Sequence, residues 1–313
     1  MNYAKRRELV ALQISGLLPG LKNAKLVEAE EYGTLLIAKW GTQKTRELLN
    51  TAENLMGEYP RQNISIICRG DNNYPEELLH LPDPPFCIFA KGNLNLLHKK
   101  KISIVGTRKP SRIGLEYARQ VAKIFSDQSF IVVSGMARGI DTAAHRASIE
   151  ASGTIGVIAH GFSHIYPLQN GDLFQAAFHE TGNILLLSEY IRSVPPARWS
   201  FPRRNRIIAA LSNNLIFVEG NAKSGAKQTA QIALDLGRDI YIFDDPLMTD
   251  NDGIKSLLED GAVNLAEYWE KNSTSIPQNL AELRKFVRKN PVYLGNGVYS
   301  TVQCQTQLPF FWE

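Results

Sequence analysis

The sequence predicts an α/β protein with a doubly wound, mostly parallel sheet and a small helical N-terminal domain. Short runs of apolar residues recur along most of the chain, and amphipathic stretches of helical length separate them. The runs are apolar throughout instead of alternating with polar residues, which is typical of parallel strands that helices cover on both faces. With 313 residues, 44% of them hydrophobic, the chain is long enough to bury a sizeable core.

Residues 1–58 are expected to be helical and to form a domain of their own, of the SAM-like type. Leucines recur there among polar residues, and the segments LPGL and KWGT interrupt the pattern. From residue 59 the character of the chain changes. NISIICRG and FCIFAKG are predicted strands, and the proline-rich stretch between them is predicted to be a stiff connection.

The main domain is predicted to span residues 59–268, where strand, loop and helix repeat. Its expected parallel strands are ISIVG, FIVVSG, TIGVIAHG, NILLLSEY, NLIFVEG and DIYIFDD. In sheets of this class ligands bind at the carboxyl ends of the strands, so the residues that carry chemistry are expected directly after each strand. Residues 269–313 lose the strand–helix rhythm and are expected to form a short C-terminal tail.

Charge is distributed unevenly along the chain, although the formal net charge is only +4. Residues 99–112 and residues 198–206 each form a block of Lys or Arg side chains without a single acid. Blocks of one sign often mark an anionic partner. The small net charge of the chain is therefore compatible with two strongly cationic segments.

Several classes of protein are not expected from this sequence. It has no run of about 18 apolar residues, so no membrane span is predicted, and its N-terminus lacks the pattern of a signal peptide. Cys68, Cys87 and Cys304 lie far apart without the spacing of a metal pair. A sparse, odd number of cysteines is typical of a reducing cytoplasm. We therefore expect a cytoplasmic protein without a metal site.

The first informative loop follows ISIVG and precedes a helix. Glycine lets the backbone approach a ligand closely, the helix start supplies free N–H groups, and arginine binds a phosphate through two donors. The loop matches neither G-x-G-x-x-G nor G-x-x-x-x-G-K-[ST], which argues against a nicotinamide dehydrogenase and a P-loop NTPase. It is a predicted phosphate site with the candidate residues Gly106, Thr107, Arg108, Lys109, Ser111 and Arg112.

A second loop of the same kind follows FIVV, with the candidate residues Ser134, Gly135, Arg138 and Gly139. Asp141 is expected to be the N-cap of the next helix, because an Asp side chain there satisfies free N–H groups. His145 lies four residues later on the same helical face. A catalytic Asp–His pair is one interpretation of this spacing, and a packing role is the interpretation that we favour.

The stretch FPRRNRIIAALS opens another helix and gathers cations at its start. Pro202 suits the first helical position. Cations at a helix N-terminus oppose the dipole by roughly 0.3–1 kcal/mol each, so an anionic ligand is expected to offset them. Compensation by an acid of the protein, such as Glu189, is the alternative. The candidate residues are Arg203, Arg204, Asn205 and Arg206.

The fourth loop follows NLIFV and has the candidate phosphate ligands Lys223, Ser224 and Gly225. Glu219 at its start is expected to be structural and not a catalytic base. Four separated phosphate sites at one sheet edge suit a polyanionic backbone better than a mononucleotide. Trp199, Phe201 and Tyr166 lie nearby in sequence. Stacking on bases is one interpretation of these residues, and core packing is the interpretation that we favour for each.

These motifs, in this order, resemble the DNA-processing protein A family (DprA, also called Smf). The resemblance covers roughly residues 64–265 and rests on YPEELLHLPDPPFCIFAKGN, SIVGTRKPSRIG, VSGMARGIDTAAHRASI, GTIGVIAHGFSHIYPLQN, LLLSEY, FPRRNRIIAALS and KSGAKQTAQIALDLGRDIYIF. It implies an extended Rossmann-like domain that binds single-stranded DNA along these loops and often forms a homodimer. It also implies a recombination mediator that protects incoming DNA and helps load the RecA recombinase in natural transformation, without a cofactor or catalytic turnover.

Three departures from the family pattern bear on this interpretation. Lys227 and Gln228 replace neutral residues after KSG. Many members end in a winged-helix domain, and the residues after Ser275 are expected to be too few for one. Where the family has Pro-Gly after its last strand, this chain has a group of acids that argues against DNA contacts from that loop, namely Asp244, Asp245, Asp250 and Asp252.

Two other functions fit the same scaffold. One is a nucleotide phosphoribohydrolase of the lysine-decarboxylase-like (LOG) family, although EGNAKSGAKQTAQ stands in place of its PGGxGTxxE motif. The other is a sensor of a small nucleotide, whose phosphates the four loops would hold. The motifs favour a single-stranded DNA-binding mediator over both.

Overall fold

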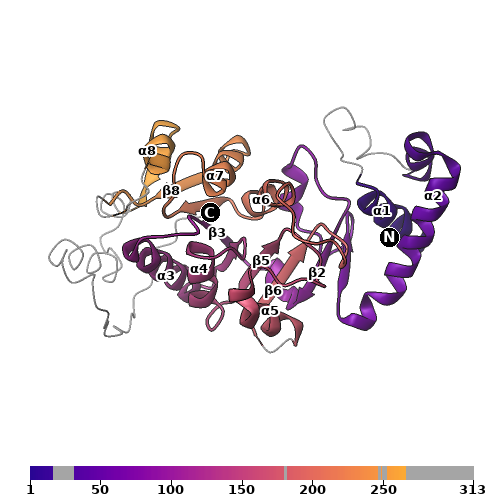
Figure 1. Ribbon diagram of the computed structural model, residues 1–313, viewed down its shortest axis with the longest axis horizontal. Helices are drawn as coiled ribbons and strands as arrows, with labels where there is room; N and C mark the ends of the chain where they lie inside the picture. Colours follow the sequence, from indigo (N-terminus) through magenta and orange to yellow (C-terminus); the bar gives the residue numbers. More distant parts are fainter. Residues whose placement is uncertain (17–31, 180–181, 246–247, 249–251, 266–313) are drawn as a thin grey trace.

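In the computed structural model, which describes residues 1–16, 32–179, 182–245, 248 and 252–265, the chain forms a mixed β-sheet between two layers of helices (Figure 1). Within these residues the sheet has nine strands in the order β1-β2-β6-β5-β4-β3-β7-β8-β9. The strands are β1 (Ser65–Cys68), β2 (Cys87–Gly92), β3 (Lys101–Val105), β4 (Ile131–Ser134), β5 (Thr154–Ile158), β6 (Ile184–Ser188), β7 (Asn214–Phe217), β8 (Asp239–Ile242) and β9 (Val263–Asn264). The helices are α1 (Tyr3–Ile14), α2 (Tyr32–Glu58), α3 (Arg112–Asp127), α4 (Ile140–Ser148), α5 (Gly171–Phe178), α6 (Ser200–Ala210), α7 (Gly225–Asp235) and α8 (Asp252–Glu259).

The strand order confirms the predicted α/β fold with a mostly parallel sheet. The chain runs from β3 through β4 and β5 to β6 in one direction, and α6 then returns it to β7, which pairs with β3 on the other side. Among the strands of the described residues, β2 pairs antiparallel with both β1 and β6, and the other pairs are parallel. The loops after β3 and β7 therefore diverge at a topological switch point, which is where sheets of this class bind ligands.

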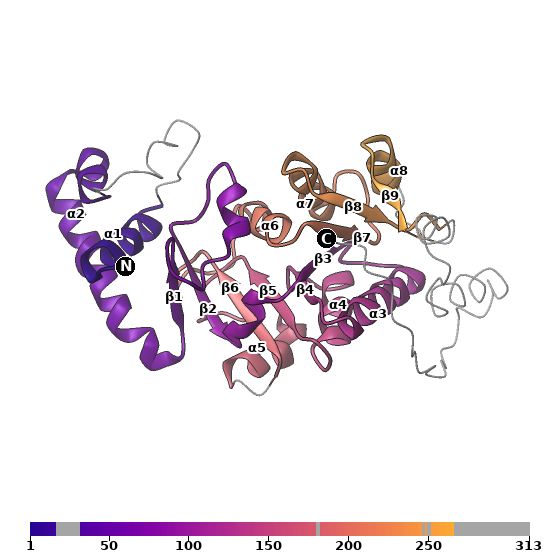
Figure 2. The same ribbon diagram turned by 180° about the vertical axis from the view of Figure 1, so that it is seen from behind.

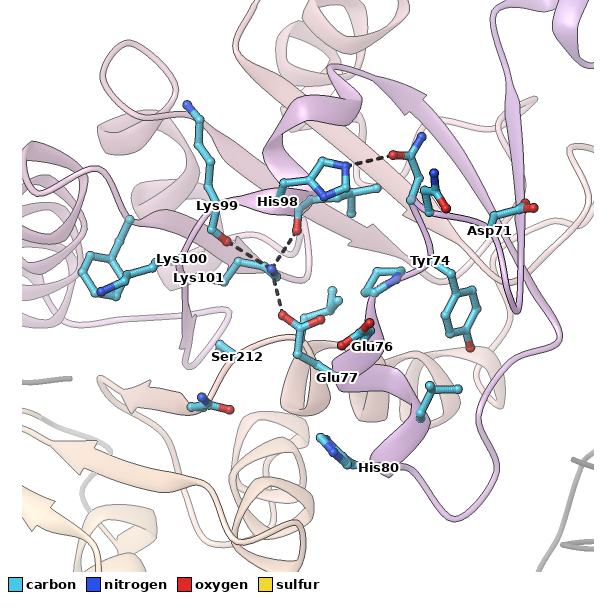
Figure 3. A pocket seen from close by; sticks show the side chains of 18 of the residues that line it. Asp71, Tyr74, Glu76, Glu77, His80, His98, Lys99, Lys100, Lys101 and Ser212 are labelled. Carbon is cyan, nitrogen blue, oxygen red and sulfur yellow. Dashed lines mark hydrogen bonds and ion pairs between the residues drawn. The ribbon is translucent and has the colours of Figure 1, made fainter. Parts of the chain in front are cut away.

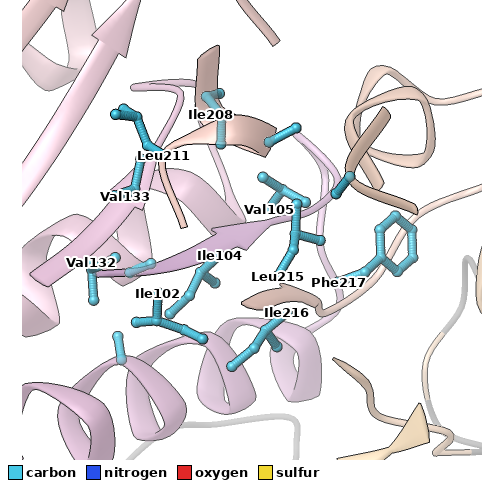
Figure 4. Close-up of a cluster of buried hydrophobic side chains, with 14 of the residues drawn as sticks. Ile102, Ile104, Val105, Val132, Val133, Ile208, Leu211, Leu215, Ile216 and Phe217 are labelled. Atoms are coloured by element: carbon cyan, nitrogen blue, oxygen red, sulfur yellow. The ribbon is translucent and has the colours of Figure 1, made fainter. Parts of the chain in front are cut away.

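Helices cover both faces of the sheet, as the continuous apolar strands predict. Both views show α3, α4 and α5 on one face and α6, α7 and α8 on the other (Figures 1 and 2). Figure 4 shows how side chains of β3, β4 and β7 meet those of α6 in the core, among them Ile104, Val133, Ile208 and Leu215. Each of these four is at most 2% exposed, so the central strands are buried on both sides.

The N-terminal helices α1 and α2 pack together at the β1 end of the sheet (Figure 2). Leu9, Leu12 and Leu36 are buried in a cluster that also contains residues of β1 and β2. The side-chain amide of Gln13 donates to the carbonyl of Glu189 at 2.9 Å and accepts from the N–H of Cys87 at 3.2 Å. The predicted helices are confirmed in the described part of 1–58, and they share one apolar cluster with the sheet.

The predicted tail at residues 269–313, together with Asp250 and Cys304, lies outside the described residues. The division of the chain at residues 58 and 268 stays a prediction. Among the helices of the described ranges, none has the length and apolar character needed to cross a membrane.

Candidate functional site

The loops that follow β3, β4 and β7 are joined to one another at the carboxyl edge of the sheet. The N–H of Thr107 donates to the carbonyl of Glu219 at 2.7 Å. The carbonyl of Thr107 accepts from the N–H of Ile140 at 3.3 Å. The predicted convergence of the loops at one edge is therefore supported by backbone contacts between them.

Glu219 holds the first loop against the end of β7. Its carboxylate accepts from the N–H and the hydroxyl of Ser111 at 2.9 and 3.0 Å. Ser111 is the N-cap of α3, and its hydroxyl accepts from the N–H of Gly114 at 3.0 Å. Ser224 caps α7 in the same way, accepting from the N–H of Lys227 at 3.1 Å. These bonds agree with a structural role for Glu219.

The prediction that Asp141 is an N-cap is wrong. The N-cap of α4 is Gly139, and Asp141 lies in the first turn. Its carboxylate accepts from the N–H groups of Gly135 and Ala137 at 3.1 and 3.3 Å, so it shapes the preceding loop instead of ending the helix. Burial raises the pKa of Asp141, and the neighbouring Arg204 opposes that rise.

His145 supports the same loop from inside the protein. Its Nε2 accepts from the N–H of Met136 at 3.2 Å, and its Nδ1 lies 2.6 Å from the hydroxyl of Thr154. That hydroxyl donates to the carbonyl of Val132, so it accepts from Nδ1–H. Burial lowers the pKa of His145 to about 3, which keeps the ring neutral. Both ring nitrogens are thus occupied, in agreement with a packing role.

The second turn of α6 connects the loops through the side chains of Arg204, Asn205 and Arg206, which contact three different parts of the fold. The buried guanidinium of Arg204 donates to the carbonyls of Gly135 and Val157. The side-chain amide of Asn205 donates to the carbonyl of Gly225 at 3.2 Å. Burial is the main reason that the pKa of Arg204 falls to about 10.

Arg206 points towards two acids. Its guanidinium pairs with Glu189, and its Nε lies 3.3 Å from Asp83. Arg203 lies 3.9 Å from the same carboxylate of Glu189. Compensation by Glu189, the alternative raised by the sequence, is therefore present. Asp83 has no recognisable signal in the sequence, because it stands in a proline-rich connection more than a hundred residues from its partner.

The remaining candidate cations are at least partly exposed to solvent. Arg203 is half-buried, and five of them are exposed: Arg108, Lys109, Arg112, Arg138 and Lys223. Within the described part of the chain none of these five forms an ion pair. Because no acid of that part neutralises them, they make this edge of the sheet electropositive.

A small pocket opens between the exposed cations and α6. Arg108 and Arg138 line it together with Met136, His160 and Arg204. Its aromatic wall is formed by Tyr166 and Phe201, whose ring centroids are 5.6 Å apart, and the guanidinium of Arg108 lies 5.3 Å from the Phe201 centroid. Tyr166 is 41% exposed, which agrees with stacking rather than core packing for this residue.

The cationic block at residues 99–112 does not form one surface. Strand β3 lies inside it, so Lys99, Lys100 and Lys101 stand at the amino end of the sheet and Arg108 at the carboxyl end. Figure 3 shows the three lysines beside a groove of about 870 Å³ at that opposite edge. There Lys101 is paired with Glu77 at 2.9 Å.

Three of the residues that depart from the family pattern form side-chain contacts within the fold, whereas Gln228 and Asp244 are exposed. Lys227 pairs with Asp260 at 2.5 Å. Asp245 is buried and accepts from the hydroxyl of Tyr117 at 2.9 Å, and Asp252 accepts from the N–H of Ala222 at 3.0 Å. In the described ranges no three His, Cys, Asp or Glu side chains are placed to hold a metal ion.

Comparison with known proteins places these features in a family. A sequence profile described as DNA recombination-mediator protein A matches residues 65–274. The DNA processing protein DprA of Bacillus subtilis is 44% identical over 189 residues, which is 60% of this chain. The chain spans 63% of that relative, so it matches less than two thirds of its length.

Two solved structures share the fold. DNA processing protein A of Streptococcus pneumoniae is 30% identical with a TM-score of 0.70, covering 83% of this chain and 94% of the other. The protein of the same name from Helicobacter pylori is 27% identical with a TM-score of 0.59, covering 72% and 96%, and its structure is described as showing a single-stranded DNA binding mode.

Proposed function

We propose that this chain, which belongs to the DNA recombination-mediator protein A family, binds single-stranded DNA along the carboxyl edge of its sheet. The observation that carries the proposal is the set of exposed cations on loops that Glu219 and Asp141 hold in place. Such a surface attracts a phosphate backbone, and the aromatic pocket beside it offers faces on which bases stack. The single-stranded DNA named for the Helicobacter pylori structure supports the same choice of ligand.

The candidate residues divide into two roles in this proposal. Phosphates contact Arg108, Lys109, Arg112, Arg138 and Lys223, which are exposed. The remaining residues shape the loops that carry these cations. They are Gly106, Thr107, Ser111, Ser134, Gly135, Gly139, Arg204, Asn205, Arg206, Ser224 and Gly225, whereas the half-buried Arg203 stands beside the exposed cations at the start of α6.

The wider role that we propose follows from family membership. The protein protects incoming single-stranded DNA and helps load the RecA recombinase during natural transformation. It works in the cytoplasm as a homodimer and acts by binding, without a cofactor or catalytic turnover.

Fluorescence anisotropy of a labelled single strand of ~30 nucleotides, titrated at several salt concentrations, tests the binding step. We expect tight binding that weakens steeply with salt and that a duplex competitor does not displace. Absence of binding would contradict the proposal and favour a small nucleotide as ligand. If binding is found, retention of RecA on the immobilised protein, with and without DNA, tests the loading step.

A further inference from the structure

Trp199 is an aromatic side chain that does not line the pocket. It stands directly before α6 and is 60% exposed. Its ring meets Tyr190 edge-on, with centroids 5.7 Å apart and an interplanar angle of 79°. Tyr190 is itself buried, so it steadies the indole while leaving most of its surface open to solvent.

Cations flank this indole on both sides in the sequence. Arg198 is exposed and directly precedes it. Arg203 lies four residues later, a spacing that places it beside Trp199 on the same side of the helix. The guanidinium of Arg203 lies 3.9 Å from the carboxylate of Glu189. An exposed aromatic ring between arginines has the composition of a surface that binds unpaired bases and their phosphates.

Trp199 and the aromatic pocket belong to the same turn of α6. Phe201, two residues after Trp199, contacts Arg108 and Tyr166 in the pocket, whereas Trp199 contacts Tyr190. Two residues in a helix are about 200° apart, so the two rings project from opposite sides of the helix start. A strand that crosses this turn would meet one ring on each side and the electropositive end of the helix between them.

We propose that the bound single strand continues from the pocket over the first turn of α6 and stacks a base on Trp199, with Arg198 and Arg203 contacting the flanking phosphates. This inference rests on the proposed function and extends the site beyond the pocket. Charge complementarity and continuity with the pocket favour nucleic acid as the occupant over a protein partner. Because every base has a π face, the contact is expected to tolerate any sequence.

The test uses the full chain with Trp199 as its single tryptophan, made by Trp40→Phe, Trp269→Phe and Trp312→Phe. Single-stranded DNA is expected to quench the remaining fluorescence, with saturation at the concentration where anisotropy of a labelled strand saturates. A matched variant that keeps only Trp40, which is 40% exposed on α2, is expected to show no quenching. In the otherwise native chain, Trp199→Ala is expected to lower affinity about tenfold and Trp199→Phe to retain most of it.

Each outcome separates this inference from the proposed function. Binding by anisotropy without quenching, together with native affinity of Trp199→Ala, would overturn the Trp199 contact and leave DNA binding intact. Quenching by RecA but not by DNA would overturn it in favour of a protein-docking surface. Absence of binding by every variant and by the native chain would overturn the proposed function as well. The affinity of Trp199→Ala decides the matter even where the triple variant fails to fold.

Discussion

Glu219 at the end of β7 accepts hydrogen bonds from both the N–H and the hydroxyl of Ser111, at 2.9 and 3.0 Å, although the two residues are 108 positions apart. The contact joins the loops on the two sides of the topological switch point. Glu219 is fully buried, so its carboxylate is shielded from competing water. The hydrogen bonds from Ser111 to Glu219 therefore fix the position of the first loop, which carries exposed cations.

Glu219→Ala is predicted to destabilise the fold and weaken DNA binding. The Ser111 N–H would lose its acceptor, and lost hydrogen bonds to a charged group cost roughly 1.5–3 kcal/mol each. Urea unfolding and DNA anisotropy measure the two effects. Glu219→Gln keeps a carbonyl acceptor at the same place and is expected to lose less of both. Equal behaviour of the Ala variant and the native chain would show that the contact does not organise the loop.

Arg108→Ala is predicted to weaken binding of single strands of every sequence. An exposed phosphate contact contributes about 0.7 to the slope of log K against log salt for single strands, so that slope is expected to flatten by about this amount. Lys123→Ala, at an exposed position late in α3, is the matched control and is expected to change neither quantity. A native salt slope in Arg108→Ala would remove this residue from the interface.

Arg206→Ala is predicted to act chiefly on stability. Its side chain and that of Glu189 are only 9% and 3% exposed, and breaking a buried pair costs roughly 3–5 kcal/mol because one charge stays behind. The double variant with Glu189→Gln is expected to recover part of the loss in a double-mutant cycle of urea unfolding. A stable Arg206→Ala variant with a flattened salt slope would instead indicate that Arg206 contacts phosphate directly.

Stability is predicted to fall in mild acid because His145 is buried in its neutral form. Its folded-state pKa of about 3 lies below the unfolded value of about 6.5, so between these values only the unfolded chain takes up the proton. The contribution of the neutral His145 to the free energy of unfolding is complete above pH 6.5. As the pH falls towards 3, this contribution decreases by roughly 1.4 kcal/mol per pH unit. Urea unfolding at pH 7 and pH 5 checks this. His145→Gln, which has no titrating ring, is expected to show a smaller difference between the two pH values, and an unchanged difference would speak against the assignment.

Gly139→Ala is predicted to disturb the second loop. Gly139 has φ +82°, and an added Cβ would lie 2.4 Å from the carbonyl oxygen of Thr107. Gly237→Ala is a matched control, because Gly237 has φ +69° but open space around it. A positive φ is unfavourable for alanine at both positions, and Gly139, with ψ −123°, also lies outside the left-handed helical region. The excess loss of stability in Gly139→Ala therefore combines this backbone conformation with the close contact between the two loops. DNA affinity is expected to fall only in Gly139→Ala, and an equal loss of stability in the two variants would indicate that the loops separate easily.

The sequence by itself determined the order of strands and helices along the chain and the loops that carry the candidate site. Apolar runs such as FIVV and NILLL encode buried parallel strands locally, because a strand covered on both faces needs apolar residues at every position. The carboxyl ends of such strands share one edge, so the candidate loops could be named without coordinates. The sequence also predicts structural roles for Glu219 and His145, and the hydrogen bonds of both residues agree with that prediction.

Only the tertiary structure decided which charges face solvent. Lys101 and Arg108 belong to one cationic segment, yet β3 carries them to opposite edges of the sheet. Arg204 and Arg206 look like exposed cations in sequence, yet carbonyls of Gly135 and Val157 and the acids Glu189 and Asp83 take up their guanidinium groups. The reason is physical: whether a charge is neutralised depends on groups brought near it by the topology, and those groups are distant along the chain and leave no local pattern.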